Sequence, residues 1–529
     1  MQRKQFIKLT GATGTFTAIG GFAWLLQSCN EQNKNGMGSN IIRIIEGDFV
    51  TALPSPPLFD LKSTTAFEAK QTSVEILKGK KSNVYGYYDG MLGKTFIVNK
   101  GDNINLRFTN LLPQATNIHW HGLIIPPEMD GFPSLVTQPG ATFQYQFKIN
   151  QRAGTYWYHP HPDGFTAEQV MQGLAGFFIV KDEEEAALKL PNGESEIAFV
   201  IQDRRFKNTG DFDYAPTMMD IMTGFLGEYI IVNGAYNPYK TVKAGWNRLR
   251  IINGSNARVY NLAFNNQQDF FVIGSDAGLV SSPEMVKNIL LSPGERIDML
   301  VDFTNEANKE IFLESKLFNG GGVQGKEAFK IMKFTIGDKT IETFSIPASL
   351  SVIEKINPST ATKTRTFNIS NASMSGGHGM DMKMDKKDKA VENSMGNMKM
   401  GKHTINGISY NAAVMNETVI AGATEIWEFD NSKGEEIHPM HFHGNHFQIL
   451  ERTGGRGKLI ATEKGWKDTV MLMPGEKVKV ITTFSQFKGK YVLNAAGLCT
   501  MFNFIQFQNS ASCHYLHAQG CGNAKHIFL

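Results

Sequence analysis

Three segments spaced along the chain share a Pro-Gly step followed directly by alternating apolar and polar residues. They read VTQPGATFQYQFKI, LLSPGERIDMLVDF and VMLMPGEKVKVITTF. Successive side chains of a β-strand point to opposite faces, so this alternation predicts a half-buried strand after each turn. One copy per about 150 residues predicts three related β-domains.

Other short alternating runs, such as KTFIVNKGDNINLRFTN and NRLRIINGS, are separated by Gly, Pro and Asn and are typical of antiparallel sandwiches. With 41% hydrophobic residues and 52 Gly, the 529-residue chain can build several cores joined by many turns. We expect boundaries near the acidic KDEEEAALKLPNGE and near PASLSVIEKINPST. The predicted domains are residues 41–183, 190–348 and 357–529.

Residues 374–400 interrupt this pattern. They read MSGGHGMDMKMDKKDKAVENSMGNMKM and contain seven of the 23 Met, with Gly, Lys and Asp but no core periodicity. Such a composition cannot bury a core, so we expect a flexible insert in the third domain.

Charge and cysteine content exclude two broad classes. The net charge is only +3, from 53 basic and 50 acidic residues, and no basic stretch stands out, so a nucleic-acid partner is not expected. The four cysteines, at 29, 499, 513 and 521, do not form the dense pattern of a disulfide framework.

The first 29 residues combine a basic start, a short apolar middle and a small-residue end, which is typical of an export signal. The stretch RKQFIK resembles a twin-arginine signal with Lys4 at the second Arg, and LLQSC resembles a bacterial lipobox. A lipobox would place a lipid on Cys29 and anchor the protein to a membrane, whereas a plain cleaved signal would release it. Both alternatives predict export to the periplasm.

Histidines cluster in three H-x-H pairs. At a frequency of 13 in 529, chance would give about 0.3 such pairs. The pairs and one nearby histidine are His119 and His121, His159 and His161, His441 and His443, and His438. Residues i and i+2 of a strand share a face, so each pair can present two imidazoles to one site. A single pair would be read as hydrogen-bonded strand histidines, but seven clustered histidines exceed one four-ligand zinc site and predict a metal cluster.

The motifs HWHG, GTYWYHPH and HPMHFHG resemble the first three copper signatures of multicopper oxidases. The resemblance extends over nearly the whole mature chain through PPEMDGFPS, INGSNARVYNL and INGISYN. It implies an all-β fold of three consecutive cupredoxin-like Greek-key β-sandwich domains. It also implies four copper ions at type 1, type 2 and binuclear type 3 sites.

Ligand roles follow from the resemblance by position. His119 and His441 would hold the type 2 copper, and His438 the type 1 copper. The type 3 pair would be held by His121, His159, His161 and His443. Asp130, in EMDGFP, matches a family carboxylate that manages protons near the cluster, although a turn aspartate before Gly131 is an equally good reading.

The fourth family signature reads H-C-H, three residues, His, four residues and usually Met. Here Ser512 stands at the first His, only two residues separate His514 from His517, and no Met follows. Cys513 and His517 would serve the type 1 copper and His514 the type 3 pair, or the tail has drifted and binds no metal.

The resemblance implies an oxidase that couples one-electron oxidation of Cu(I), of phenols or of both to four-electron reduction of O2 to water. Thioether sulfur selects Cu(I), so residues 374–400, with His378 inside and His403 beside them, favour Cu(I) capture over an inert solvated loop. A monomer is expected. The alternative is a copper-sequestering protein of the same fold, without turnover because its fourth motif is broken.

The unusual C-terminus predicts a shifted reading frame. Permitted codons for QGCGNAKHIFL, read one base later, encode Lys or Arg followed by DAGMQNIFF, which restores the missing Met and a closing strand. Resequencing the gene tests this, and nucleotides that cannot encode DAGM in the shifted frame would reject it.

Overall fold

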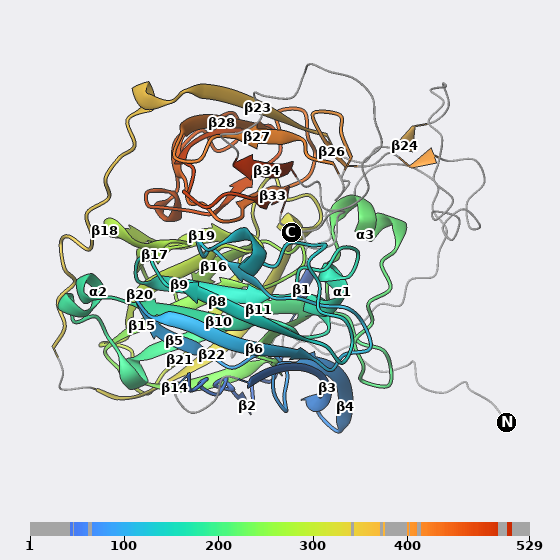
Figure 1. Cartoon of the computed structure of the whole chain (residues 1–529). Helices are drawn as coiled ribbons and strands as arrows, with labels where there is room; N and C mark the ends of the chain where they lie inside the picture. The colour runs from blue at the N-terminus through green and yellow to red at the C-terminus, as the bar shows by residue number, and fades with distance from the viewer. Residues whose placement is uncertain are drawn as a thin grey trace, which may run out of the picture. The chain divides into compact units, whose positions relative to one another are not determined.

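The computed structural model describes residues 43–45, 47–61, 66–339, 343–370, 374–375, 399–400, 403–409, 414–495 and 505–509. Strands dominate these residues, beside three short α-helices: α1 (Thr166–Met171), α2 (Glu183–Ala187) and α3 (Met218–Thr223). The predicted all-β class is therefore confirmed (Figure 1). In the described part of the chain, no helix is both long and apolar enough to span a bilayer.

The first pair of sheets has the strand orders β4-β3-β6-β8 and β5-β10-β9-β7. Its strands are β3 (Ala66–Leu77), β4 (Lys80–Gly86), β5 (Phe96–Asn99), β6 (Asn103–Asn110), β7 (His119–His121), β8 (Thr142–Lys148), β9 (Gly154–His159) and β10 (Gly176–Lys181). Alternate side chains of both sheets meet in one core that includes Phe108, Trp120 and Tyr158.

The second pair of sheets has the orders β19-β16-β21-β22-β14-β2, with β1 also on β22, and β13-β12-β11-β15-β20-β17-β18. Its early strands are β1 (Arg43–Ile45), β2 (Thr51–Ala52), β11 (Glu196–Arg204), β12 (Tyr229–Val232), β13 (Ala235–Tyr236), β14 (Pro238–Ala244) and β15 (Trp246–Asn253). Its later strands are β16 (Tyr260–Phe264), β17 (Phe270–Ser275), β18 (Gly278–Val286), β19 (Asn288–Leu291), β20 (Arg296–Asp302), β21 (Glu310–Ser315) and β22 (Glu327–Lys339). Phe199, Leu262 and Met299 belong to the shared core.

The third pair of sheets, orange to red in Figure 1, has the orders β26-β23-β28-β32-β30 and β27-β34-β33-β29-β31. Its strands are β23 (Lys363–Ser370), β26 (Thr404–Ile405), β27 (Glu417–Val419), β28 (Thr424–Asp430), β29 (His438–Phe442), β30 (Gln448–Thr453), β31 (Thr469–Leu472), β32 (Lys477–Thr483), β33 (Lys490–Ala495) and β34 (Ile505–Asn509). Trp427 and Met440 lie in its core. A separate two-residue ribbon joins β24 (Met374–Ser375) to β25 (Lys399–Met400), while residues 376–398 of the predicted insert lie outside the described residues.

Two expectations about strand pairing are wrong. The sandwiches are not purely antiparallel, because each pair of sheets contains parallel neighbours such as β3 with β6, β11 with β15 and β23 with β28. In addition, β1 and β2, placed by sequence at the start of the first domain, pair with β22 and β14 of the second pair. Period-two alternation shows which face of a strand is buried, but not its direction or its sheet.

The three Pro-Gly repeats fold alike. Gly140, Gly294 and Gly475 have φ angles of +77°, +83° and +80°, which glycine adopts without steric strain. Strands β8, β20 and β32 follow, and they pair antiparallel with β6, β15 and β28 respectively. The repeat therefore places one equivalent strand in each pair of sheets.

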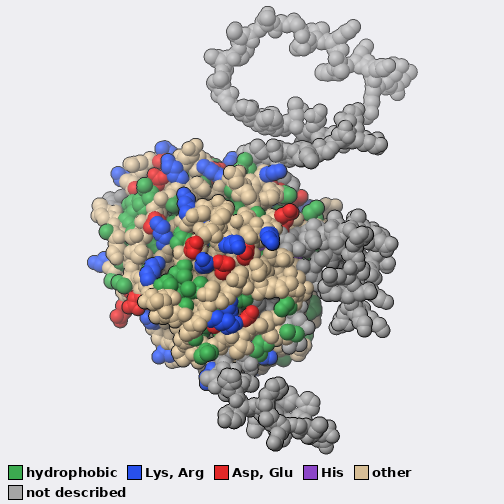
Figure 2. All heavy atoms as spheres, turned by 90° about the horizontal axis from the view of Figure 1, so that it is seen from above, with side chains coloured by type: hydrophobic (Ala, Val, Ile, Leu, Met, Phe, Trp, Pro, Cys, Tyr) green, Lys and Arg blue, Asp and Glu red, His purple; other side chains and the backbone are tan. Residues whose placement is uncertain are grey.

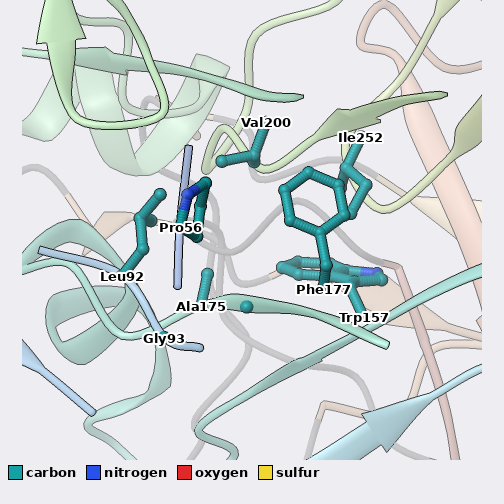
Figure 3. A pocket seen from close by; sticks show the side chains of 9 residues that line it. Pro56, Leu92, Gly93, Trp157, Ala175, Phe177, Val200 and Ile252 are labelled. Atoms are coloured by element: carbon teal, nitrogen blue, oxygen red, sulfur yellow. The ribbon is translucent and has the colours of Figure 1, made fainter. Parts of the chain in front are cut away.

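An apolar contact joins the first and second pairs of sheets (Figure 3). Trp157 of β9, Phe177 of β10, Val200 of β11 and Ile252 of β15 line a small apolar pocket here, together with Pro56 and Leu92 among others. The ring of Trp157 also lies against His121 and His159, with centroids 5.0 and 4.3 Å apart. This contact thus supports one wall of the histidine site.

The surface agrees with the near-neutral net charge. On the face drawn in Figure 2, Lys and Arg are interspersed with Asp and Glu, and neither sign gathers into one large area.

Candidate metal centre

Four of the histidines come from two neighbouring strands of the first pair, β7 and β9, and from the segment directly after β9. β7 and β9 are antiparallel with His119 opposite His159, and the two-residue period places His119 and His121 on one face of β7. Trp120, between them, is buried in the core on the other face. His161 follows the end of β9, where its backbone N–H donates to Asn117 Oδ1 at 2.7 Å.

The third pair contributes two more histidines, His441 on β29 and His443 directly after it. His441 and His443 alternate with Met440 and Phe442, which belong to the core. The same alternation separates His438, three residues before His441, from the histidine cluster. The i, i+2 spacing thus places His441 and His443 on the side of the strand that faces away from the core.

The structure brings six histidines from the two pairs of sheets together, and all are buried. They are His119, His121, His159, His161, His441 and His443. The ring of His119 stacks on that of His443, and the ring of His121 on that of His441, each with centroids 3.7 Å apart. The ring of His161 meets that of His443 edge-on at 4.9 Å.

Asp130 orients one histidine from each pair of sheets. It follows a short 3-10 turn, Pro127–Met129. Its carbonyl oxygen accepts from His119 Nδ1 at 2.7 Å, and its carboxylate Oδ2 accepts from His443 Nδ1 at 2.9 Å. In the neutral form of both rings, Nε2 therefore carries no proton.

Asp468 does the same from the third pair, just before β31. Its carbonyl oxygen accepts from His441 Nδ1 at 3.0 Å, and its carboxylate Oδ1 accepts from His121 Nε2 at 3.2 Å. The unprotonated nitrogen is then Nε2 in His441 but Nδ1 in His121. Sequence reasoning missed Asp468 because GWKDTVML carries no histidine spacing; its only signal is a charge pair opening an apolar strand.

Unprotonated ring nitrogens face one another at two places in the cluster. His119 Nε2 lies 3.3 Å from His441 Nε2, and His121 Nδ1 lies 3.3 Å from His159 Nε2, whose other nitrogen donates to Pro160 O. Two lone pairs repel at this distance unless a cation lies between them. Two nitrogens about 2.0 Å from one metal at a roughly tetrahedral angle would be about 3.3 Å apart, so the residues fit a metal.

The remaining donor atoms agree with a metal centre. Three groups have ligand atoms within 4.8 Å of one another: His119, His441 and His443; His119, His121 and His159; and His121, His441 and Asp468. The buried His443 Nε2 has no hydrogen-bond partner among the described residues. Imidazole nitrogen suits copper, zinc, iron and nickel.

Burial favours the neutral, coordinating form of four of these rings. It lowers the pKa of His121, His159, His161 and His443 well below the usual value, because a buried imidazolium loses its hydration. The neighbouring histidines lower these pKa values further.

The two aspartates lie in opposite electrostatic environments. Burial raises the pKa of Asp130, and contact with His119 opposes this only in part. Burial alone would also raise the pKa of Asp468, but the charge of Arg296 lowers it well below the usual range. The environment therefore favours the protonated form of Asp130 more than that of an ordinary aspartate, whereas it favours the ionised form of Asp468.

His438 lies in a separate hollow of the structure. Its ring is buried and its centroid is 6.1 Å from that of His403, whose Nε2 donates to Ile221 O of α3 at 3.2 Å. Burial, with a contribution from His403, lowers the pKa of His438 to about 3. The hollow is also lined by Thr223, Gly224 and Glu436.

Several predicted residues lie outside the described part of the chain. They are Cys29, His378, Cys513, His514 and His517.

Gly122, directly after His121, approaches the cluster too closely for any side chain. A Cβ there would lie 2.6 Å from Asp468 Oδ2 and 2.7 Å from Arg296 Nη2, and its φ is +89°. Gly140 has a similar φ of +77°, but a Cβ on it would have nothing within 4 Å. The two glycines separate the effect of backbone strain from that of crowding.

We expect Gly122→Ala to lower the melting temperature more than Gly140→Ala. Both substitutions place alanine in the left-handed region, which costs about 1–2 kcal/mol, whereas only Gly122→Ala adds an overpacking cost of about 1–3 kcal/mol. Scanning calorimetry measures the difference. Equal melting temperatures of the two variants would contradict the close approach.

Comparison with known proteins agrees with this site. Three family profiles described as multicopper oxidase match residues 68–185, 198–328 and 359–495. Multicopper oxidase mco of Staphylococcus epidermidis is 32% identical over 431 residues, which cover 81% of this chain and 83% of the relative. Cell division protein FtsP of Xenorhabdus nematophila is 29% identical over 498 residues, or 92% of this chain and 93% of the relative.

A solved structure shows the same architecture. McoA multicopper oxidase from the hyperthermophile Aquifex aeolicus superposes with a TM-score of 0.75 at 32% identity, covering 87% of this chain and 99% of its own. The fold of cupredoxin-like sandwiches is thereby confirmed. With the profiles and the relatives together, the chain belongs to the multicopper oxidase family.

Proposed function

We propose that the protein is a copper-dependent oxidase that takes single electrons from Cu(I), and from small phenols, and reduces O2 to water. The observation that carries this proposal is the pair of 3.3 Å contacts between unprotonated histidine nitrogens. Copper bound there would supply the redox chemistry. Four electrons and four protons are consumed for each O2 converted into two waters.

We assign the copper-ligand roles from the positions of these residues in the family motifs. His119 and His441 would hold the type 2 copper, and the remaining four histidines of the cluster the type 3 pair, together with His514. His438 would hold the type 1 copper with Cys513 and His517.

The chain's own groups can manage protons at the cluster. Asp130 Oδ2 accepts from His443 Nδ1, and burial raises the pKa of this carboxyl group. We assign Asp130 the transfer of protons to the site where O2 is reduced. Asp468 stays ionised beside Arg296 and holds His121 and His441 in place.

A second candidate function is copper sequestration without turnover. It is favoured by Ser512 at the position of a ligand histidine and by the shortened spacing before His517. A relative named as a cell division protein shows that the family includes members whose names describe no oxidase.

We further propose export to the periplasm as a monomer. Support for export comes from the basic and apolar pattern of residues 1–29, with or without a lipid on Cys29.

Copper-loaded protein should consume O2 when supplied with Cu(I) or a phenol, at one O2 per four electrons and without releasing peroxide. His441→Gln should abolish this uptake because it removes one nitrogen of a facing pair. Zinc-loaded protein is the matched control, since Zn²⁺ can occupy the histidines but is not redox-active. Copper binding without O2 uptake would reject the oxidase in favour of sequestration.

The Met-rich segment should matter more for Cu(I) than for phenols. Because Ser375 pairs with Lys399, an Asn-Gly turn can replace residues 376–398 and close the ribbon. We expect this variant to lose Cu(I) oxidation more than phenol oxidation, as measured by O2 uptake. Changing Met380, Met382 and Met384 to Leu in the full-length chain removes three sulfur atoms but keeps the length of the segment, so it tests the thioethers alone. An equal loss of activity with both substrates would contradict Cu(I) capture.

A further inference from the structure

Arg296, the first residue of β20, has every guanidinium donor occupied. Nε donates to Thr155 O at 3.0 Å, and Nη1 donates to Gly294 O at 2.9 Å and to Asp468 Oδ1 at 2.7 Å. Nη2 donates to Asp276 O at 2.7 Å and to Asp468 Oδ2 at 2.5 Å. A guanidinium has five N–H donors in a rigid plane, so its orientation is fully determined here.

These partners come from all three pairs of sheets. Thr155 belongs to β9 of the first pair, Gly294 and Asp276 to the second, and Asp468 precedes β31 of the third. Arg296 is fully buried, so loss of its partners would leave a charge without solvent. The second pair of sheets contributes no histidine to the cluster, but it supplies this junction.

Asp276 contacts the residues that flank Asp468 in sequence and also the backbone of Arg296. Its Oδ1 accepts from the backbone N–H of Arg296 at 2.9 Å, and its Oδ2 accepts from the backbone N–H of Thr469 at 3.1 Å. Oδ2 also lies 3.0 Å from Lys467 Nζ, which is 3.0 Å from Glu295 Oε1. The main chain and the side chain of Asp468 are thus both held from the second pair.

The Pro-Gly repeat shows that this arrangement is specific to its second copy. A Cβ on Gly294 would lie 3.2 Å from His121 Cε1, whereas Gly140 and Gly475 have open space at that position. The residue two positions after the glycine is Arg296 in the second copy, but Thr142 and Lys477 in the others. Thr142 is exposed, and Lys477 pairs with Asp430 near the surface.

We propose that Arg296 is a positioning residue of the metal centre: through the carboxylate of Asp468 it selects which ring nitrogen of His121 faces the metal. His121 donates to that carboxylate, whereas His441 donates to the carbonyl oxygen of Asp468. If Asp468 turned away, His121 could move its proton to Nδ1, the nitrogen that faces His159. The inference rests on the proposed copper site, but its first readout does not require copper.

The test compares Arg296→Lys with Arg452→Lys in the full chain. Lysine keeps the charge but cannot form the planar fork. Arg452 is the matched control, because its side chain is also fully buried and is paired with Glu463 and Glu476 rather than with Asp468. Both variants should lose thermal stability, so stability alone does not decide the outcome.

Long-range 1H–15N spectra of metal-free, 15N-histidine-labelled protein report the tautomers. We expect wild type to show His121 protonated on Nε2, with the signal assigned by its absence in His121→Gln. Arg296→Lys should lose this state and Arg452→Lys should keep it. Unchanged histidine tautomers in folded Arg296→Lys would overturn the proposal.

Cu(II) binding gives the second readout. Loss of a residue that orients metal ligands typically weakens metal affinity by about 10–100-fold, and we expect this for Arg296→Lys but not for Arg452→Lys in competition with a chelator. Equal affinities of the two variants would also count against the proposal. If Arg296→Lys does not fold, Asp276→Asn takes its place with the same expectations. Wild type that binds no copper would reject the oxidase, while the tautomer result would still decide the role of Arg296.

Discussion

The cluster depends on a paired set of hydrogen bonds that four buried histidines donate to two aspartates. Asp130 and Asp468 each use one main-chain and one side-chain oxygen, and each holds one histidine from the first pair of sheets and one from the third. A buried imidazole has no water to satisfy its N–H, so an acceptor on one nitrogen fixes the tautomer and leaves the other nitrogen to a metal. His119 stacks on His443 and His121 stacks on His441, so each stack also joins a histidine of the first pair of sheets to one of the third.

The environments of the two aspartates differ although their contacts match. Asp130 is buried, and no Lys or Arg in the described part of the chain forms an ion pair with it, whereas Asp468 forms a bidentate ion pair with Arg296. A buried ion pair is costly to break because it leaves an uncompensated charge. One half of the cluster is therefore held by a rigid charge network that reaches the second pair of sheets, and the other half by a carboxyl group whose pKa is raised by burial.

His438 lies on the same strand as His441 but faces away from the cluster. Because side chains alternate along β29, His441 and His443 point to the first pair of sheets while His438 lies beside His403 and α3. A step of three residues along β29 thus separates the hollow around His438 from the histidine cluster. In the sequence, His403 stands out only because it is close to the Met-rich segment. In the fold its ring lies beside that of His438, which is 35 residues away in sequence.

The sequence by itself determined the all-β class, the three equivalent Pro-Gly strands and the six histidines of the cluster, because strand period and turn chemistry are local properties. Tertiary structure alone decided that β1 and β2 join the second pair of sheets and that parallel neighbours occur, since pairing depends on contacts between distant segments. It also decided the roles of Asp468 and Arg296, which carry no periodic signal. Their effect arises only where burial removes water and three distant segments supply each other's hydrogen-bond partners.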